Sequence, residues 1–242
     1  MRDGVTSVIL KIGGYCHPDI EQLKYAPCRV LSPWPFNPNQ SSMKYGCRGE
    51  HELQAQMNSQ ARAQRFYERQ MQDSLTTRMV ALIRQQEMMF IATANSQGHC
   101  DCSPRFGHAG FVCVLDEKTL AYPEYRGNGV YASLGNIKEQ PQIGLVFVDF
   151  FDTTVGLHVN GTAQHYLTSE VPDKLKSYLE LNKPDLVTRI ERWVVIDIEE
   201  AYIHCSKHVP LLAKKEKQIA WGTDDPVAKS NDFFCENHDK AS

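Results

Sequence analysis

The sequence lacks long apolar runs: no stretch approaches the roughly 20 residues that a membrane-spanning helix requires. It also lacks an excess of basic charge, since 26 Lys and Arg stand against 29 Asp and Glu and the formal net charge is -3. Proteins that bind nucleic acid normally carry a clustered basic face, and no nucleic-acid-binding motif is present here. We therefore expect neither a membrane nor a nucleic acid among the partners.

Cysteine pairing motifs are missing as well. The eight cysteines are scattered and never form a C-x-x-C pair, so their spacing suggests neither a zinc site nor a disulfide framework. The N-terminal segment VTSVILKIGG contains a lysine and has no small-residue cleavage site, so it does not fit a signal peptide. Reduced thiols without a secretion signal are typical of a cytoplasmic protein, and we expect no metal site.

Composition divides the chain into three parts. Residues 1–50 carry five of the twelve prolines without sustained periodicity, which predicts an irregular N-terminal extension. Residues 51–208 form the predicted main domain and begin with two amphipathic helices over residues 51–87, where apolar side chains recur at helical intervals. Residues 209–242 are predicted to be a C-terminal tail.

From residue 88 the apolar pattern becomes typical of strands. The run MMFIATAN and the alternating HCDCSP predict a β-hairpin. Further strands are predicted at GFVCVLD, TLAYP, QIGLVFVDF, TVGLHVNGTAQHYL and RWVVIDIEEAYIHC, and helices at NGVYASLGNIKEQ and VPDKLKSYLELN. Apolar alternation continues through Asn160 and Gly161, which favours one long strand in which the glycine allows close approach of a backbone or a ligand. Many strands with few helices predict a mainly β, α+β fold: an antiparallel barrel flanked by helices.

The segment HCDCSPR carries a candidate anion-binding residue. Strand alternation places Cys100 and Cys102 on one face, where we expect them to be buried as small apolar side chains. Asp101, Ser103 and Arg105 lie on the other face. A guanidinium at the end of a strand can hold an anion through two hydrogen bonds, so Arg105 is a candidate for binding a phosphate.

A second candidate is the segment EYRGNGVYASLGN, which follows the predicted strand TLAYP. Its glycines precede a helix, and the first amides of a helix are unpaired donors with partial positive charge. Such a turn suits a phosphate, to which Arg126, Asn128 and Ser133 would add donors. The alternative is a capped helix after a turn without a ligand. The segment HCSKH also leaves two interpretations open: metal or haem ligation by His204 or His208, or a polar cluster at a subunit surface.

Taken in order, the segments FIATANSQGHCDCSPR, GFVCVLDEKTLAYPEYRGNG, SLGNIKEQPQIGLVFVDF and GLHVNGTA resemble the pyridoxamine 5'-phosphate oxidase-like flavin-binding split-barrel family. The resemblance covers residues 88–164 and, less clearly, continues to residue 205. It implies a six-stranded split barrel that forms a homodimer, with flavin mononucleotide (FMN) at each subunit interface. By position, it implies that the flavin is held by Ser103, Arg105, Pro123, Tyr125, Arg126, Gly127, Asn128, Ser133 and Asn136.

The sequence departs from the true oxidases at two places. The Arg-Lys pair usual at the start of the helix is replaced by VYAS, so Arg105 and Arg126 must supply most of the positive charge. The C-terminal Arg and His that grip pyridoxal phosphate have no counterpart in HCSKHVP. The chain is thus more similar to the oxidase-related branch, whose members bind FMN, FAD, a deazaflavin or haem.

The resemblance implies a flavin-binding oxidoreductase that passes a hydride or electrons between the flavin and a small organic substrate. The protein would fix the pose of the flavin, and no catalytic acid or base can be assigned. The alternative is a protein that stores or senses flavin or haem without turnover.

Overall fold

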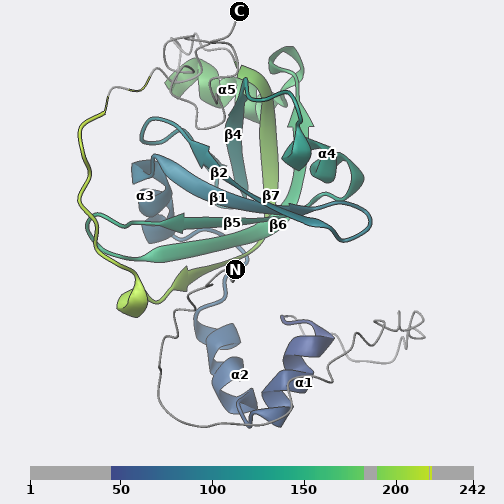
Figure 1. Ribbon diagram of the computed structural model, residues 1–242, viewed down its shortest axis with the longest axis vertical. Coiled ribbons are helices and arrows are strands. Elements are labelled where there is room, and N and C mark those ends of the chain that lie inside the picture. The colour runs from purple at the N-terminus through teal and green to yellow at the C-terminus, as the bar shows by residue number, and fades with distance from the viewer. Residues whose placement is uncertain (1–44, 183–189, 218, 220–242) are drawn as a thin grey trace, which may run out of the picture. The chain divides into compact units, whose positions relative to one another are not determined.

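The computed structural model describes residues 45–182, 190–217 and 219 (Figure 1). The chain divides into two units, Met1–Tyr45 and Gly46–Ser242, and the description below concerns the second. Residues 1–44 of the predicted extension lie outside the described residues, as does most of the predicted tail. The predicted boundaries of the extension, the main domain and the tail therefore stay predictions.

Between residue 45 and the first strand the structure has three helices, where the sequence predicts two: α1 (Arg48–Gln56), α2 (Gln60–Arg69) and α3 (Thr77–Gln85). The extra break follows α1, where Asn58 takes the left-handed conformation at φ 49°, which a right-handed helix cannot continue through. Helix α3 begins at Thr76, whose side-chain oxygen accepts the backbone N–H of Met79 at 3.4 Å. Within the described ranges, no helix combines the length and the apolar character needed to cross a membrane.

Seven strands form one antiparallel sheet in the order β2-β1-β5-β6-β7-β4-β3. The strands are β1 (Met88–Ala94), β2 (Cys100–Phe106), β3 (Cys113–Asp116), β4 (Thr119–Tyr125), β5 (Gln142–Val148), β6 (Gly156–Tyr166) and β7 (Ile190–His204). The α+β fold class with helices flanking an antiparallel sheet is confirmed. The strands are the seven segments that the residue pattern predicts, one more than the six that the resemblance implies.

The long strand β6 confirms the prediction for Gly161. The strand runs unbroken through this residue, and a bulge in its pairing with β7 lies between Asn160 and Gly161. A Cβ atom at position 161 would lie 2.1 Å from the carbonyl oxygen of Asp197 on β7. Only glycine allows this approach, because any side chain would collide with the neighbouring backbone.

Apolar side chains cover both faces of β4 and β7. On the inner face, Leu120 and Tyr122 of β4 join the main core with residues of β1, β3, β5, β6, β7, α3 and α4 (Ala132–Glu139). On the outer face, a smaller cluster joins Ala121 and Trp193 to Leu175 of α5 (Asp173–Asn182). Two short 3-10 helices complete the described chain, Thr168–Glu170 and Ser206–His208. Packing on both faces fixes the position of β4, and the residues at its end therefore have a rigid support.

Candidate functional site

A cleft of about 530 Å³ lies between β2, the end of β4 and the start of α4. We refer to it as the phosphate cleft, after the group that the sequence predicts its residues to bind. Eight of the nine predicted site residues line this cleft: Ser103, Arg105, Pro123, Tyr125, Arg126, Gly127, Asn128 and Ser133. The ninth, Asn136, does not. Its side-chain amide donates to the Thr93 hydroxyl at 3.0 Å and so ties α4 to β1. The structure thus brings the predicted residues together, while their role in binding stays a prediction.

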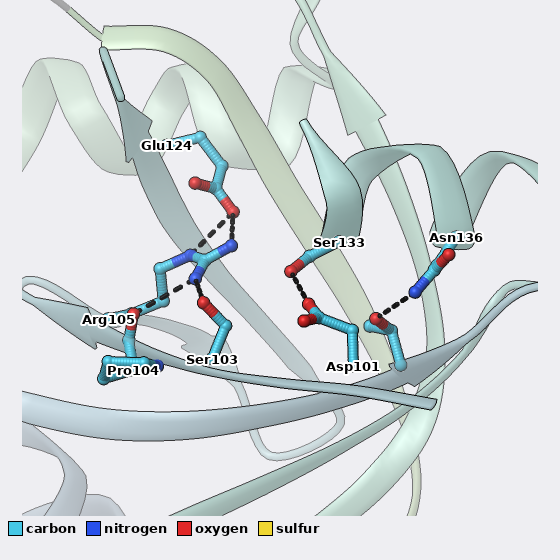
Figure 2. Close-up of polar contacts among 8 residues, drawn as sticks. Asp101, Ser103, Pro104, Arg105, Glu124, Ser133 and Asn136 are labelled. Carbon is cyan, nitrogen blue, oxygen red and sulfur yellow. Dashed lines mark hydrogen bonds and ion pairs between the residues drawn. The ribbon is translucent and has the colours of Figure 1, made fainter. Parts of the chain in front are cut away.

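Arg105 is the most extensively bonded side chain of the cleft (Figure 2). Its Nε and Nη2 atoms each lie 2.8 Å from Oε1 of Glu124. Its Nη1 atom donates to the Ser103 hydroxyl at 2.7 Å and to the Pro104 carbonyl at 3.1 Å. The ion pair is largely shielded from water, since the Arg105 and Glu124 side chains are 17% and 13% exposed.

The ion pair also shows how the sheet is curved. Strand β2 lies at one edge of the sheet, and β1, β5, β6 and β7 separate it from β4 in the strand order. The side chains of Arg105 and Glu124 nevertheless meet, so the sheet curls until its two ends approach each other. The phosphate cleft is the space that remains between those ends and the start of α4.

Two carboxylates of the cleft were not among the predicted site residues. Glu124 holds Arg105, and Asp101 accepts a hydrogen bond from the buried Ser133 hydroxyl at 2.8 Å (Figure 2). Strand alternation could have identified both: Asp101 shares a face with Ser103 and Arg105, and Glu124 shares the core face of β4 with Tyr122. A carboxylate on a core face requires a cation or a hydrogen-bond donor.

Burial governs the electrostatics of the β4 side of the cleft. It raises the pKa of Glu124, and the adjacent Arg105 charge only partly opposes this shift. Burial likewise raises the pKa of Tyr125. The lining carries two cations, Arg105 and Arg126, and two carboxyl groups, Asp101 and Glu124. Its formal charge is therefore close to zero when both carboxyl groups are ionised.

The turn between β4 and α4 has few internal partners for its backbone. The Asn128 side-chain oxygen accepts the Val130 N–H at 2.9 Å, which shapes the turn, and Gly129 adopts φ 80°. Tyr131 immediately precedes α4, adopts φ 55° and provides no side-chain acceptor to the first turn of the helix. A Cβ atom added at Gly127 or Gly129 would meet nothing within 4 Å. Space and backbone donors therefore occur together here, and they fit a phosphate group.

The cysteines of β2 correct one prediction. Cys100 and Cys102 share a face as expected, but both are exposed rather than buried. Strand β2 lies at an edge of the sheet, and its opposite face, which carries Asp101, Ser103 and Arg105, is the more buried one. Amphipathic alternation identified the two faces and did not identify which of them points inward.

The other predicted candidates lie away from the phosphate cleft. The His204 ring centre lies 5.5 Å from that of His158, whose pKa is lowered by burial and by the His204 charge. No group of three or more His, Cys, Asp or Glu side chains placed to hold a metal ion occurs in the described part of the chain. A second cleft, of about 620 Å³, is lined by residues of α1, α2, β6 and β7 and by none of the predicted site residues.

Comparison with known proteins identifies a family. The family model described as pyridoxamine 5'-phosphate oxidase matches residues 75–205. No curated protein matches the chain in sequence.

Solved structures with similar folds share little sequence with the chain. HupZ from Group A Streptococcus is 22% identical, with 52% of this chain and 91% of HupZ covered and a TM-score of 0.41. An FMN-binding protein from Syntrophomonas wolfei is 12% identical, with coverages of 64% and 97% and a TM-score of 0.36. HutZ, the heme storage protein from Vibrio cholerae, is 8% identical, with coverages of 53% and 94% and a TM-score of 0.39.

Proposed function

The chain belongs to the pyridoxamine 5'-phosphate oxidase family, and on that premise we propose that the phosphate cleft binds the phosphate end of FMN. The protein then acts as an oxidoreductase that transfers a hydride or electrons between the flavin and a small organic substrate. Bound flavin supplies the redox chemistry, and the protein fixes its pose and controls access to it.

One observation carries this proposal: residues from β2, β4 and α4 that are distant in sequence converge on one cleft with room for a phosphate. Each has a group that suits the task. The Ser103 hydroxyl accepts from Arg105, so its own proton can be donated to a phosphate oxygen. Because the Asn128 side-chain oxygen is occupied by Val130, its NH₂ group can serve as a donor. The backbone amides at the start of α4 complete the set.

We also propose that a second copy of the chain covers the mouth of the cleft, which gives a homodimer with the cofactor at the interface. Three apolar side chains that line the cleft support this arrangement, because Phe106, Val130 and Tyr131 are 45%, 70% and 50% exposed. Sedimentation analysis tests it. A dimer that Val130→Glu converts to a monomer would support the proposal, and a wild-type monomer at micromolar concentration would contradict it.

A non-catalytic haem-binding protein is the second candidate. The His158 and His204 pair favours it, because burial and the neighbouring imidazole keep His158 neutral and so able to ligate iron. Spectra separate the candidates: a yellow protein whose absorbance bleaches with NADH or NADPH supports the oxidoreductase. A Soret band that shifts in His204→Ala supports haem binding.

Mass spectrometry of the small molecule released from natively purified protein tests the cofactor directly. FMN would support the proposal, whereas FAD, a deazaflavin or haem would replace it with the corresponding alternative. The exposed thiols of Cys47, Cys100, Cys102 and Cys205 support a cytoplasmic location, which cell fractionation tests.

A further inference from the structure

The hydrogen bonds of Arg105 limit how this residue can hold a ligand. A guanidinium has five N–H donors, and contacts within the protein occupy four of the five here. Two of these contacts go to Glu124, one to Ser103 and one to the Pro104 carbonyl. A phosphate gripped through two hydrogen bonds by Arg105 must therefore displace one of these partners. Glu124 is the anionic partner, and it occupies the same two donors that a phosphate oxygen pair would use.

Glu124 has a second potential partner close by. Tyr122 lies two residues earlier on the same face of β4 and is fully buried. Its hydroxyl is near enough to Glu124 to lower the pKa of that carboxyl, but it makes no hydrogen bond of ordinary geometry. Burial and the Glu124 charge raise the pKa of Tyr122, so this hydroxyl stays protonated and can donate. A Glu124 carboxyl released from Arg105 can turn to Tyr122 and accept a hydrogen bond from its hydroxyl.

The groups around Glu124 decide whether it stays charged after that change. Arg192 lies opposite Glu124 in the β4–β7 pairing, and it already contacts Nδ1 of His165 on β6 at 3.3 Å. Arg105 is the cation that contacts the Glu124 carboxylate, so losing it leaves that carboxylate in a buried setting. Other titratable or charged groups at this end of the sheet are Asp101 on β2, which accepts a hydrogen bond from Ser133, and Tyr125 on β4. The turn after β4 adds Arg126 and Tyr131, and the Tyr131 hydroxyl donates to Glu191.

We propose that Glu124 is an internal competitor for Arg105, which a flavin phosphate displaces, and that the displaced carboxyl takes up one proton from solvent and turns to the Tyr122 hydroxyl. This rests on the proposed function, because the ligand is the phosphate of FMN. The cleft then distinguishes FMN from neutral riboflavin, because only the FMN phosphate can replace the Glu124 carboxylate on Arg105. Glu124 is accordingly a specificity-determining residue that acts through Arg105.

The exchange makes binding depend on pH in a defined direction. Glu124 already has a raised pKa when paired with Arg105, and losing that cation raises it further in the complex. Binding therefore takes up protons at pH values between the two pKa values of Glu124. By linkage, this part of the FMN affinity weakens as pH rises through that window.

Isothermal titration of the full chain with FMN, in buffers of different ionisation enthalpy, tests the exchange. Glu124→Gln removes the competing charge with little change in shape, and Glu139→Gln, an acid outside the cleft, is the matched control. At a pH between the two pKa values of Glu124, we expect Glu124→Gln to bind FMN about tenfold more tightly than wild type and to take up about one proton fewer for each FMN bound. Any proton that the FMN phosphate itself takes up is the same for both proteins, so it cancels when their proton uptakes are compared. The riboflavin affinity of Glu124→Gln should equal that of wild type. The control Glu139→Gln should equal wild type in FMN affinity and in proton uptake.

Tyr122→Phe gives an independent test that leaves both charges in place. It should weaken FMN binding about threefold in the wild-type background and have no effect in the Glu124→Gln background. Equal FMN affinity and equal proton uptake in wild type and Glu124→Gln would overturn the competitor role while leaving FMN binding intact. Absence of FMN binding to wild type and to Glu124→Gln, both shown to be folded by circular dichroism, would instead overturn the proposed function.

Discussion

The two sides of the phosphate cleft differ in how far their polar groups are already paired. On the β2–β4 side, Arg105, Ser103 and Glu124 bond to one another within a largely buried network. On the side of the turn, residues 126–131, two glycines border open space and the first turn of α4 lacks a side-chain cap. The first side is organised before any ligand arrives, and the second offers donors that a ligand can complete.

The difference assigns separate tasks to the two sides. The turn can recognise a phosphate through the amides at the start of α4, which no side chain caps. The β2–β4 side must exchange a partner, so it contributes selectivity more than affinity. Substitutions on the two sides should therefore have different signatures: stability and binding change together on the β2–β4 side, and binding changes alone at the turn.

Arg105→Ala should have the largest effect. It leaves Glu124 buried without its cation, so we expect the free energy of unfolding to fall by about 3 kcal/mol. FMN affinity should fall about tenfold or more, since a charge-assisted contact is lost. Urea unfolding and fluorescence titration measure the two effects. The double variant Arg105→Ala/Glu124→Ala should recover most of the stability without recovering FMN binding; recovery of both would show that Arg105 does not contact the ligand.

Gly127→Val should separate binding from stability on the other side. Its Cβ atom meets nothing within 4 Å in the free protein, so we expect the free energy of unfolding to change by less than about 0.5 kcal/mol. FMN affinity should fall about tenfold, because the side chain blocks approach of a phosphate to the backbone. If the FMN affinity of this folded variant equals that of wild type, the turn is not the phosphate site.

Ser133→Ala should have a smaller effect that touches both properties. The hydroxyl is buried and donates to Asp101, so its loss should cost about 1 kcal/mol of stability. FMN affinity should fall only about threefold, because other donors surround the phosphate. A stability equal to that of wild type would mean that the bond to Asp101 contributes nothing.

The pH dependence of unfolding should distinguish the buried acid from an exposed one. The raised pKa of Glu124 contributes stability that is present below its unfolded pKa, about 4.5, and is lost as pH rises through the folded pKa. The Glu124→Gln variant should therefore gain stability relative to wild type as pH rises from 4.5. Glu139 has a pKa lowered by hydrogen bonds from the backbone and side chain of Ser96, so it should show the opposite trend. Parallel pH profiles for Glu124→Gln and Glu139→Gln would contradict the assigned environments.

Much of the fold could be predicted because local periodicity governs it. The seven strands, the unbroken β6 and the turn before α4 all follow from alternation and from glycine. The two faces of β2 were separated correctly, yet Cys100 and Cys102 were assigned to the buried one. Which face points inward depends on where the rest of the sheet lies, and periodicity within one strand carries no information about that.

The pairing of the site residues could not be predicted for the same reason. Arg105 meets Glu124 only because the sheet curls and brings β2 against β4, across four intervening strands. Ser133 reaches Asp101 only because α4 returns over β2. Local patterns identified the donors of the cleft, whereas the acceptors that hold them depend on tertiary packing.

Parallel fluorescence titrations of the wild-type protein with FMN and with riboflavin test the central claim most directly, because the two ligands differ only in the phosphate. We expect FMN to bind about tenfold or more tightly than riboflavin, and Gly127→Val to remove most of this difference. Equal affinities for the two flavins, or no binding of either, would contradict a phosphate site in this cleft.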